Sequence, residues 1–296
     1  MKNRVIAIGD VIDDILVIPQ GEIRIDTDTK SEIRANAGGS ASNFACWLAS
    51  LNVPVDFVGR VGEKDLGRHN LEFVSHGVTP HLQADTELPT GSIVVLVQGQ
   101  QRSFLTDRGA NRKLDSDAID HQLLKNAAVL YISGYSLMES LSAAQVQEII
   151  ARAKAEDVMV IIDPGSAGFI SDFGVAKFLD AIAGADIVVP SWEEGKILTG
   201  EDRPEVIAEA LGARFPIVAL TLGELGAVLY NKGTTTRIEA FAADVVDATG
   251  AGDAFAAGLI ANLIRGKDLE TCAIEGARVA AKAVTLIGGR PKPQKA

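Results

Sequence analysis

The sequence is short of cysteine and aromatic residues, and its positive charges are outnumbered. Only Cys46 and Cys272 occur, far apart and without a C-x-x-C pair, so neither a disulfide framework nor a zinc motif is expected. Two reduced thiols are typical of a cytoplasmic protein. Lysine and arginine number 28 against 39 acidic residues, for a formal net charge of −11. Such a surface repels phosphate backbones, so we expect no nucleic-acid partner.

Long apolar runs are also missing. After the basic start, the run Val5–Ile8 is too short for a signal-peptide core, and no stretch approaches the length of a membrane span. We therefore expect a soluble cytoplasmic protein with no membrane partner. The 296 residues, 47% of them hydrophobic, suffice for one large α/β domain, with or without a small appendage.

Short β-branched runs alternate with longer helical patterns along the chain. This order predicts a three-layer α/β/α fold, in which helices cover both faces of a mostly parallel central sheet. The expected strands are residues 5–9, 55–59, 128–133, 158–163, 186–190 and 217–221. The expected helices are residues 40–51, 64–76, 143–156, 172–184, 203–213, 250–265 and 269–287.

Two pairs of strand-like segments break this alternation. Residues 12–18 and 32–37 follow the first strand without a helix between them, and residues 92–98 and 102–106 form a predicted hairpin around Gly99-Gln100. We expect these four strands to form a small β lid within a single domain of residues 1–296. The lid comprises about residues 12–37 and 90–108 and covers the carboxyl ends of the main strands. The alternative is an antiparallel extension of the main sheet.

The clearest chemical motif is Asp247-Ala248-Thr249-Gly250-Ala251-Gly252-Asp253, which precedes a helix rich in small residues. Gly250 and Gly252 permit a tight turn, and backbone N–H groups at a helix N-terminus point at an anion. The helix dipole would keep Asp253 ionised, ready to accept a proton from a hydroxyl beside a bound phosphate. Phosphoryl transfer needs this combination. The alternative is a glycine-rich turn followed by an ordinary carboxylate.

Three further segments carry candidate ligand groups. Gly38-Gly39-Ser40-Ala41-Ser42-Asn43 opens the first long helix and suits a polyhydroxylated ligand, a helix N-cap at Ser40, or both. Asp10–Asp14 follows the first strand, where α/β proteins bind ligands, although each carboxylate could equally be a solvated loop charge. Thr221–Gly226 could contact a nucleotide or simply lead into a hairpin.

Together these segments resemble the ribokinase/PfkB family of carbohydrate and nucleoside kinases, from Val5 to about Gly289. Gly38-Gly39 with Asn43, and Val58–Gly62 with Asp65-Leu66-Gly67, resemble the family's amino-terminal signature. The segment from Asp247 to Phe255 resembles its carboxy-terminal signature. The resemblance implies a ribokinase-like fold with a small β lid. It also implies Mg²⁺-dependent transfer of the γ-phosphate of ATP to a primary hydroxyl.

The resemblance also implies roles for the candidate residues. Asp253 is the catalytic base, and the anion hole consists of Gly250, Ala251 and Gly252. The substrate contacts are Asp14, Gly38, Gly39, Asn43 and, as in some members, Arg108. ATP contacts Thr221, Gly223 and Gly226. Glu194 takes a magnesium-linked role, and Asp247 is the candidate contact for K⁺ beside the anion hole. Ser191 stands where the family usually has Asn, so the water network around Mg²⁺ is expected to differ.

Substrate and assembly stay open at this point. Ribose, fructose, 2-keto-3-deoxygluconate and a nucleoside all present a primary hydroxyl beside vicinal hydroxyls. We favour a sugar over a nucleoside, because a base needs an apolar or aromatic wall and only 5% of the residues are aromatic. A non-catalytic sugar- or nucleotide-binding protein is the alternative outside the kinases. The exposed lid sheet could pair in a homodimer.

Overall fold

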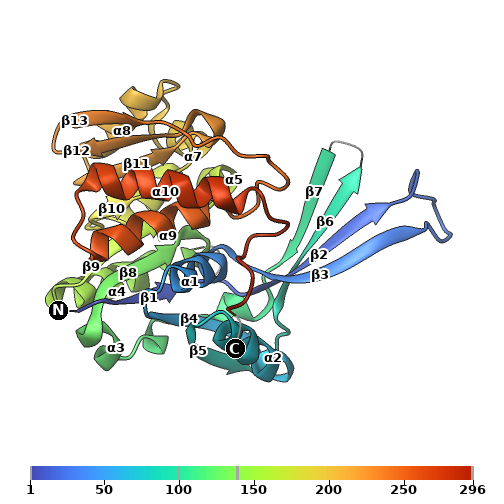
Figure 1. The fold of residues 1–296 in the computed structure, drawn as a ribbon. Helices are drawn as coiled ribbons and strands as arrows, with labels where there is room; N and C mark the ends of the chain where they lie inside the picture. Colours follow the sequence, from blue (N-terminus) through green and yellow to red (C-terminus); the bar gives the residue numbers. More distant parts are fainter. Residues whose placement is uncertain (1, 99–100, 138–139, 295–296) are drawn as a thin grey trace.

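The structure is a computed structural model that describes residues 2–98, 101–137 and 140–294. In these residues a nine-stranded sheet forms the centre of a three-layer body (Figure 1). The strand order is β13-β12-β11-β10-β9-β8-β1-β4-β5, and the pairs from β11 to β5 are parallel. The strands are β1 (Arg4–Ile8), β4 (Val55–Gly62), β5 (Thr79–Asp85), β8 (Ala127–Ser133), β9 (Met159–Asp163), β10 (Ile187–Val188), β11 (Ile217–Thr221), β12 (Ala227–Asn231) and β13 (Thr234–Ile238).

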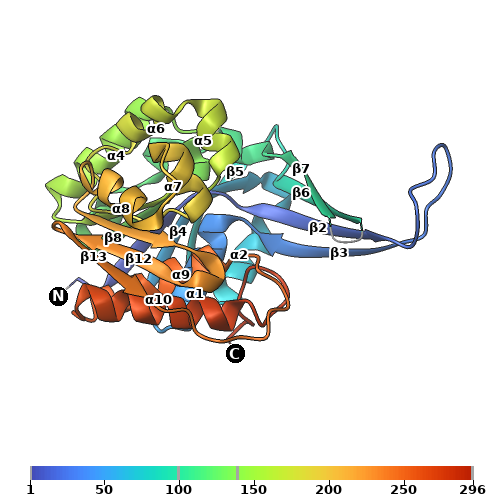
Figure 2. The same ribbon diagram turned by 90° about the horizontal axis from the view of Figure 1, so that it is seen from above.

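Helices cover both faces of this sheet (Figure 2), as the alternating pattern predicts. The residues Val5 to Ile8 of β1 are all buried, which explains why the parallel strands read as unbroken apolar runs. One face carries α1 (Ser40–Ser50), α2 (Leu66–Ser75), α9 (Ala251–Ile264) and α10 (Leu269–Ala283). The other carries α3 (His121–Asn126), α4 (Ala143–Ala155), α5 (Ala167–Phe173), α6 (Val175–Ala181), α7 (Trp192–Thr199) and α8 (Pro204–Gly212).

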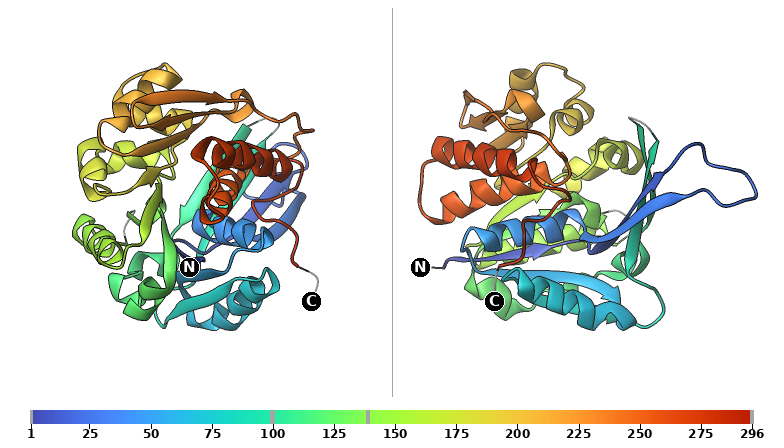
Figure 3. Two further views of the ribbon diagram at one scale, coloured as in Figure 1. Left: turned by 60° about the vertical axis from the view of Figure 1, so that its left-hand side comes forward. Right: turned by 45° about the vertical axis from the view of Figure 1, so that its right-hand side comes forward.

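A second, smaller sheet projects from the body (Figures 1 and 3). Its strand order is β3-β2-β6-β7, with β2 (Ile12–Pro19), β3 (Ser31–Gly38), β6 (Gly91–Gln98) and β7 (Gln101–Asp107). The predicted small separate sheet is therefore confirmed, and the alternative of an extension of the main sheet is wrong. The predicted hairpin tip, Gly99-Gln100, lies outside the described residues.

Several predicted boundaries are wrong for physical reasons. The helix expected at residues 172–184 is α6, which begins only after Gly174, a residue with φ 97°, a conformation that favours glycine. Helix α5, which ends before this glycine, was not predicted. The strand expected at 186–190 shortens to Ile187–Val188, and the last helix ends at Ala283. The sequence pattern missed β5. Short 3₁₀ helices complete the connections: η1 (Glu63–Asp65), η2 (Gly109–Lys113), η3 (Ser116–Ala118), η4 (Gly134–Leu137) and η5 (Gly223–Leu225).

Across residues 2–98, 101–137 and 140–294, none of the helices has the length and apolar character needed to span a lipid bilayer.

Candidate active site

The carboxyl ends of neighbouring parallel strands bring polar groups to one edge of the main sheet. Asp10 follows β1, and Asp163 is the last residue of β9. Both side chains are buried, with exposed fractions of 6% and 8%. This edge is the usual ligand site of an open α/β sheet, and the base of the small sheet joins the body here.

The glycine turn before α9 has the backbone shape of an anion site. Gly250 is the N-cap of α9 and has φ 76°, and a Cβ there would lie 2.6 Å from the carbonyl oxygen of Gly289. A Cβ at Gly252 would meet no atom within 4 Å, so open space lies in front of the first turn. No side chain in the described part of the chain caps this helix. The first-turn N–H groups can therefore bind a phosphate oxygen.

Asp253 lies in the first turn of α9 and is buried. The hydroxyl of Ser40 donates to its Oδ1 at 2.7 Å, and the amide of Asn43 donates to its Oδ2 at 3.2 Å. Burial raises the pKa of Asp253 to about 7, against these two hydrogen bonds, which lower it. Desolvation thus acts against the ionisation that the helix dipole was expected to favour. A pKa near neutrality suits a general base.

A cavity of about 220 Å³ lies directly beside Asp253 and contains two further carboxylates, those of Asp163 and Glu194. Burial raises the pKa of both, and the charges of Glu194 and Asp253 raise that of Asp163 further. Within the described residues, no group of three or more His, Cys, Asp or Glu side chains could hold a metal ion. These oxygens fit a Mg²⁺ ion whose ligands are mainly phosphate oxygens and water.

The carboxylate of Glu194 is also part of a capping box at the start of α7. It accepts a hydrogen bond from the backbone N–H of Ser191 at 2.8 Å, and Ser191 is the N-cap of that helix. Serine and asparagine cap helices about equally well. The serine at this position therefore preserves the helix start that places Glu194 in the cavity.

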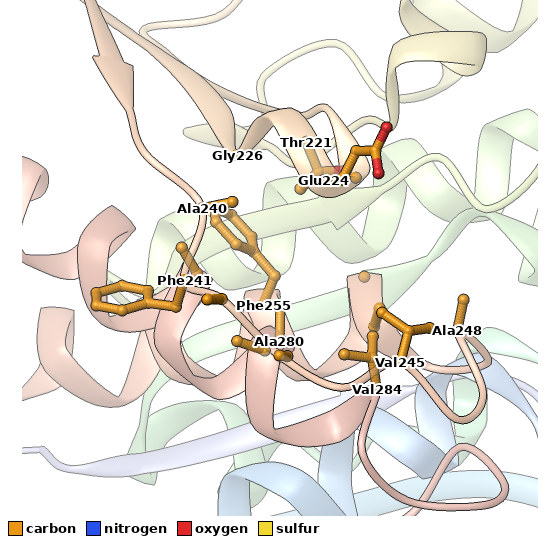
Figure 4. A pocket seen from close by; sticks show the side chains of 17 residues that line it. Thr221, Glu224, Gly226, Ala240, Phe241, Val245, Ala248, Phe255, Ala280 and Val284 are labelled. Carbon is orange, nitrogen blue, oxygen red and sulfur yellow. The ribbon is translucent and has the colours of Figure 1, made fainter.

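A larger cavity, of about 710 Å³, opens on the other side of the glycine turn. Figure 4 shows Thr221 and Glu224 on one side of it, with Val245, Ala248 and Val284 on another. The predicted nucleotide contacts Thr221, Gly223 and Gly226 all line it. The two cavities share Thr221, Ala248, Ala251 and Gly252, so they join at the turn. The 221–226 segment is both a cavity wall and the hairpin that links β11 to β12.

The predicted substrate contacts gather next to Asp253. A Cβ at Gly38 would lie 2.1 Å from Oδ2 of Asp14, so the Asp14 carboxylate packs directly against this glycine. Burial raises the pKa of Asp14 to about 6, although the Arg290 guanidinium lowers it. Gly39, with φ 97°, is the N-cap of α1, the helix that carries Asn43.

Arg108 lies at the wall of the same region. Its Nη1 is 3.9 Å from Oδ2 of Asp10, and its guanidinium lies 4.7 Å from the centroid of the Tyr135 ring. Tyr135 lines the smaller cavity together with Asp253. The structure thus brings together all the predicted substrate contacts, from β2, β3, α1 and the end of β7, at one edge of the sheet.

Comparison with known proteins identifies the chain. Residues 2–295 match the model of the pfkB family carbohydrate kinase. The chain belongs to this family. It is therefore a phosphotransferase with an alcohol group as acceptor. The similarity also confirms the predicted ribokinase-like fold and the kinase activity, as that of a sugar or nucleoside kinase.

The kinase has relatives with different substrates. The ATP-dependent 6-phosphofructokinase of Thermoanaerobacterium thermosaccharolyticum is 28% identical, over 97% of this chain and 89% of the relative. The solved adenosine kinase of Sinorhizobium meliloti is 25% identical at a TM-score of 0.87, covering 98% of this chain and 96% of that one. Arabidopsis thaliana ribokinase, solved with ribose and ATP, is 25% identical at a TM-score of 0.80, covering 97% and 94%.

The carboxylates of Asp13 and Asp247 bind protein groups. Asp13 binds the guanidinium of Arg68 with both oxygens, at 2.9 and 2.7 Å. Asp247 accepts hydrogen bonds from the backbone and hydroxyl of Thr249 and from the N–H of Gly288. Asp247 thereby orders the loop before α9, and its contact with K⁺ stays a prediction.

Four residues of the kinase site were missed in the sequence or given another role there. The interpretation of Ser40 as an N-cap is wrong, because Gly39 is the N-cap and the Ser40 hydroxyl binds Asp253. For Asp163 the sequence contained one indication of a site, because it is an acidic residue at the end of a buried strand. Tyr135 and Arg290 had none, since each joins the site only through the tertiary fold.

Proposed function

We propose that this kinase transfers the γ-phosphate of ATP to a primary hydroxyl of a small sugar of the ribose, fructose or 2-keto-3-deoxygluconate type. The observation that carries the proposal is the position of Asp253. Asp253 lies beside the glycine turn where the two cavities join. Its carboxylate accepts hydrogen bonds from the side chains of Ser40 and Asn43. The larger cavity has the volume for a nucleotide, and its walls are mainly small apolar residues.

In the proposed mechanism, the N–H groups of residues 250–252 hold the transferring phosphate. Asp253 aligns the sugar hydroxyl and takes its proton as the new oxygen–phosphorus bond forms and the bond to ADP breaks. Glu194 and Asp163 would hold Mg²⁺ at the cavity, and the ion would supply positive charge that neutralises the phosphates of ATP. Asp14 binds the sugar hydroxyls. The small sheet excludes water when it closes over the site.

One observation favours a nucleoside as the second candidate acceptor. Phe104 of β7 is 63% exposed and lies on the same face of the small sheet as Asp14. The strand register places them there. Asp14 lies opposite Ile93, which lies opposite Thr106. Two residues along, Leu16 lies opposite Val95, which lies opposite Phe104. Alternate residues of a strand share a face. A nucleobase could therefore stack on Phe104 above a ribose held by Asp14.

The other face of the small sheet supports a homodimer. Ile33 and Leu105 point there, with exposed fractions of 65% and 62%, on the two outer strands of the sheet. We propose that two copies pair through this face. Ile33→Lys should then convert a dimer to a monomer in analytical ultracentrifugation. A cytoplasmic location fits the two free, buried cysteines, Cys46 and Cys272.

A substrate panel tests the proposed function. Ribose, fructose, fructose 6-phosphate, 2-keto-3-deoxygluconate and adenosine are each incubated with ATP and Mg²⁺, and ADP release is measured against Asp253→Asn. We expect a sugar to stimulate ADP release most, and only with the wild type. If adenosine is the best acceptor instead, Phe104→Ala should raise its KM and leave that of ribose unchanged. ADP release that no acceptor stimulates would contradict the proposal.

A further inference from the structure

The segment that follows α10 crosses the back of the candidate site. Residues 288–294 run from the loop before α9, past α1, to α2 (Figure 1). Their anchors join three elements. They are the bonds from the Gly288 N–H to Asp247 at 3.0 Å, from Trp47 to the Gly289 carbonyl at 2.9 Å, from His76 to the Pro291 carbonyl at 3.2 Å, and from the Gln294 N–H to the Ser75 carbonyl at 3.1 Å.

Arg290 lies in the middle of this segment, and its side chain is 7% exposed. Its Nη2 donates to the carbonyl of Gly38 at 2.8 Å, and its Nε donates to Oδ1 of Asn43 at 3.2 Å. Its Nη1 is 3.5 Å from the carboxylate of Glu72. With its donors directed at these protein groups, the guanidinium is held in place and is not directed at a substrate.

The contact with Asn43 decides which way that amide points. The side chain of asparagine has an acceptor end and a donor end, whereas a guanidinium only donates. The oxygen of Asn43 therefore faces Arg290, and its nitrogen is left to donate to Oδ2 of Asp253. The flipped amide would set its oxygen against the carboxylate of Asp253 and its N–H groups against the guanidinium.

We infer that Arg290 is a positioning residue for the catalytic carboxylate, acting through the orientation of Asn43. The inference rests on the proposed function, in which Asp253 takes the proton. It makes the C-terminal segment part of the active site, although residues 288–294 lie beyond the second signature motif.

The surrounding charges agree with this role. The Arg290 guanidinium lowers the pKa of Asp253, whereas burial and the charge of Asp10 raise it. Asp163 and Tyr131 also face this carboxyl. Around Arg290 itself, the charged or titratable neighbours are Asp14, Glu72, His69 and Cys46.

The test compares four variants for kcat, KM and the pH profile of kcat/KM. Arg290→Met removes the donors and the charge, Arg290→Lys keeps the charge alone, and Asn43→Ala removes the intermediary. Arg214→Met is the matched control, because Arg214 is exposed and pairs with Asp180 at the surface. We expect Arg290→Met to lower kcat about 10- to 100-fold, with the KM for ATP unchanged. The acid limb of its profile should move to higher pH. Arg290→Lys should keep the limb in place but lower kcat, and Arg214→Met should change neither.

The double variant separates positioning from general support of the fold. In the Asn43→Ala background, Arg290→Met should lower kcat little further, because its effect passes through that amide. Fully additive losses, or a normal kcat and acid limb in Arg290→Met, would overturn the inference. If Arg290→Met does not fold, Arg290→Lys in both backgrounds decides the same question.

A readout without turnover distinguishes this inference from the proposed function. The Asp253 carboxyl is followed by carbon-13 NMR and assigned by its loss in Asp253→Asn. The pKa of this carboxyl should rise in Arg290→Met and should be unchanged in Arg214→Met. If the wild type phosphorylates no acceptor of the panel, the proposed function fails, but this titration still tests the link between Arg290 and Asp253. An unchanged titration refutes the link.

Discussion

The hydroxyl oxygen of Ser40 lies 2.7 Å from Oδ1 of Asp253, although the two residues are 213 positions apart in the chain. The contact joins the first turn of α1, from the amino-terminal motif, to the first turn of α9, from the carboxy-terminal motif. Each motif is therefore incomplete alone. The base comes from one, and the groups that orient it come from the other.

Removal of the Ser40 hydroxyl should make the base titrate at higher pH. The hydrogen bond from Ser40 lowers the pKa of Asp253, so Ser40→Ala raises it from about 7. The acid limb of kcat/KM should then move up by about one pH unit, given the strength of a hydrogen bond to a charged group. Ser50→Ala, at the far end of the same helix, is the control. An unmoved limb would show that Ser40 has no part in tuning the base.

Substitution of the neighbouring residues Asp14 and Asp13 should have different effects on substrate binding. Asp14→Ala should raise the KM for the sugar strongly, because each lost charged hydrogen bond costs about 1.5–3 kcal/mol, and should leave the KM for ATP nearly unchanged. Asp13→Ala should be mild, since it loses a half-exposed pair with Arg68 and a 3.6 Å contact with His69, neither of which is a predicted substrate contact. Equal losses for sugar and ATP in Asp14→Ala would assign that residue a structural role.

Activity should require Mg²⁺. The site is rich in carboxylates, and ATP adds several negative charges, so the ion has to neutralise the phosphates. Excess chelator should abolish turnover, and added Mg²⁺ should restore it. Glu194→Gln keeps a carbonyl oxygen able to accept the Ser191 hydrogen bond, and should raise the Mg²⁺ concentration needed for half-maximal rate. Full activity in chelator would contradict this reading; stimulation by K⁺ is a separate expectation.

Asp253→Asn should also be more stable than the wild type at alkaline pH. The pKa of Asp253 is raised to about 7 in the folded chain, above its ordinary value of 3.8. The raised pKa contributes to the stability of the folded chain, and this contribution is fully present below pH 3.8. It is lost as the pH rises through 7. The variant lacks this titration. Its melting temperature should exceed that of the wild type at pH 8, by at least about 2 °C, and the difference should shrink towards pH 4. A difference independent of pH would show that burial does not disfavour the charge.

Local signals predicted the parts of this kinase that lie within one segment. The glycine turn and Asp253 are contiguous, and the apolar runs of strands such as β1 and β11 are local too. Helix α5 was missed and the next helix was expected to start too early, because apolar spacing does not reveal the φ of 97° at Gly174 that separates α5 from α6. Several wall residues of the larger cavity escaped prediction because they are alanines, which carry no chemical signal. Arg290 was missed because its partners, Gly38 and Asn43, are near only in space.

The central claim is that Asp253 acts as the base while backbone N–H groups hold the phosphate. The most direct measurement is kcat of Asp253→Asn with the best acceptor of the panel, together with ATP binding by calorimetry on the same sample. We expect kcat to fall by roughly 10²–10⁴, the usual share of general-base catalysis, and ATP affinity to be retained. A folded variant with near-normal kcat would contradict the mechanism, and one that no longer binds ATP would show that Asp253 instead shapes the loop.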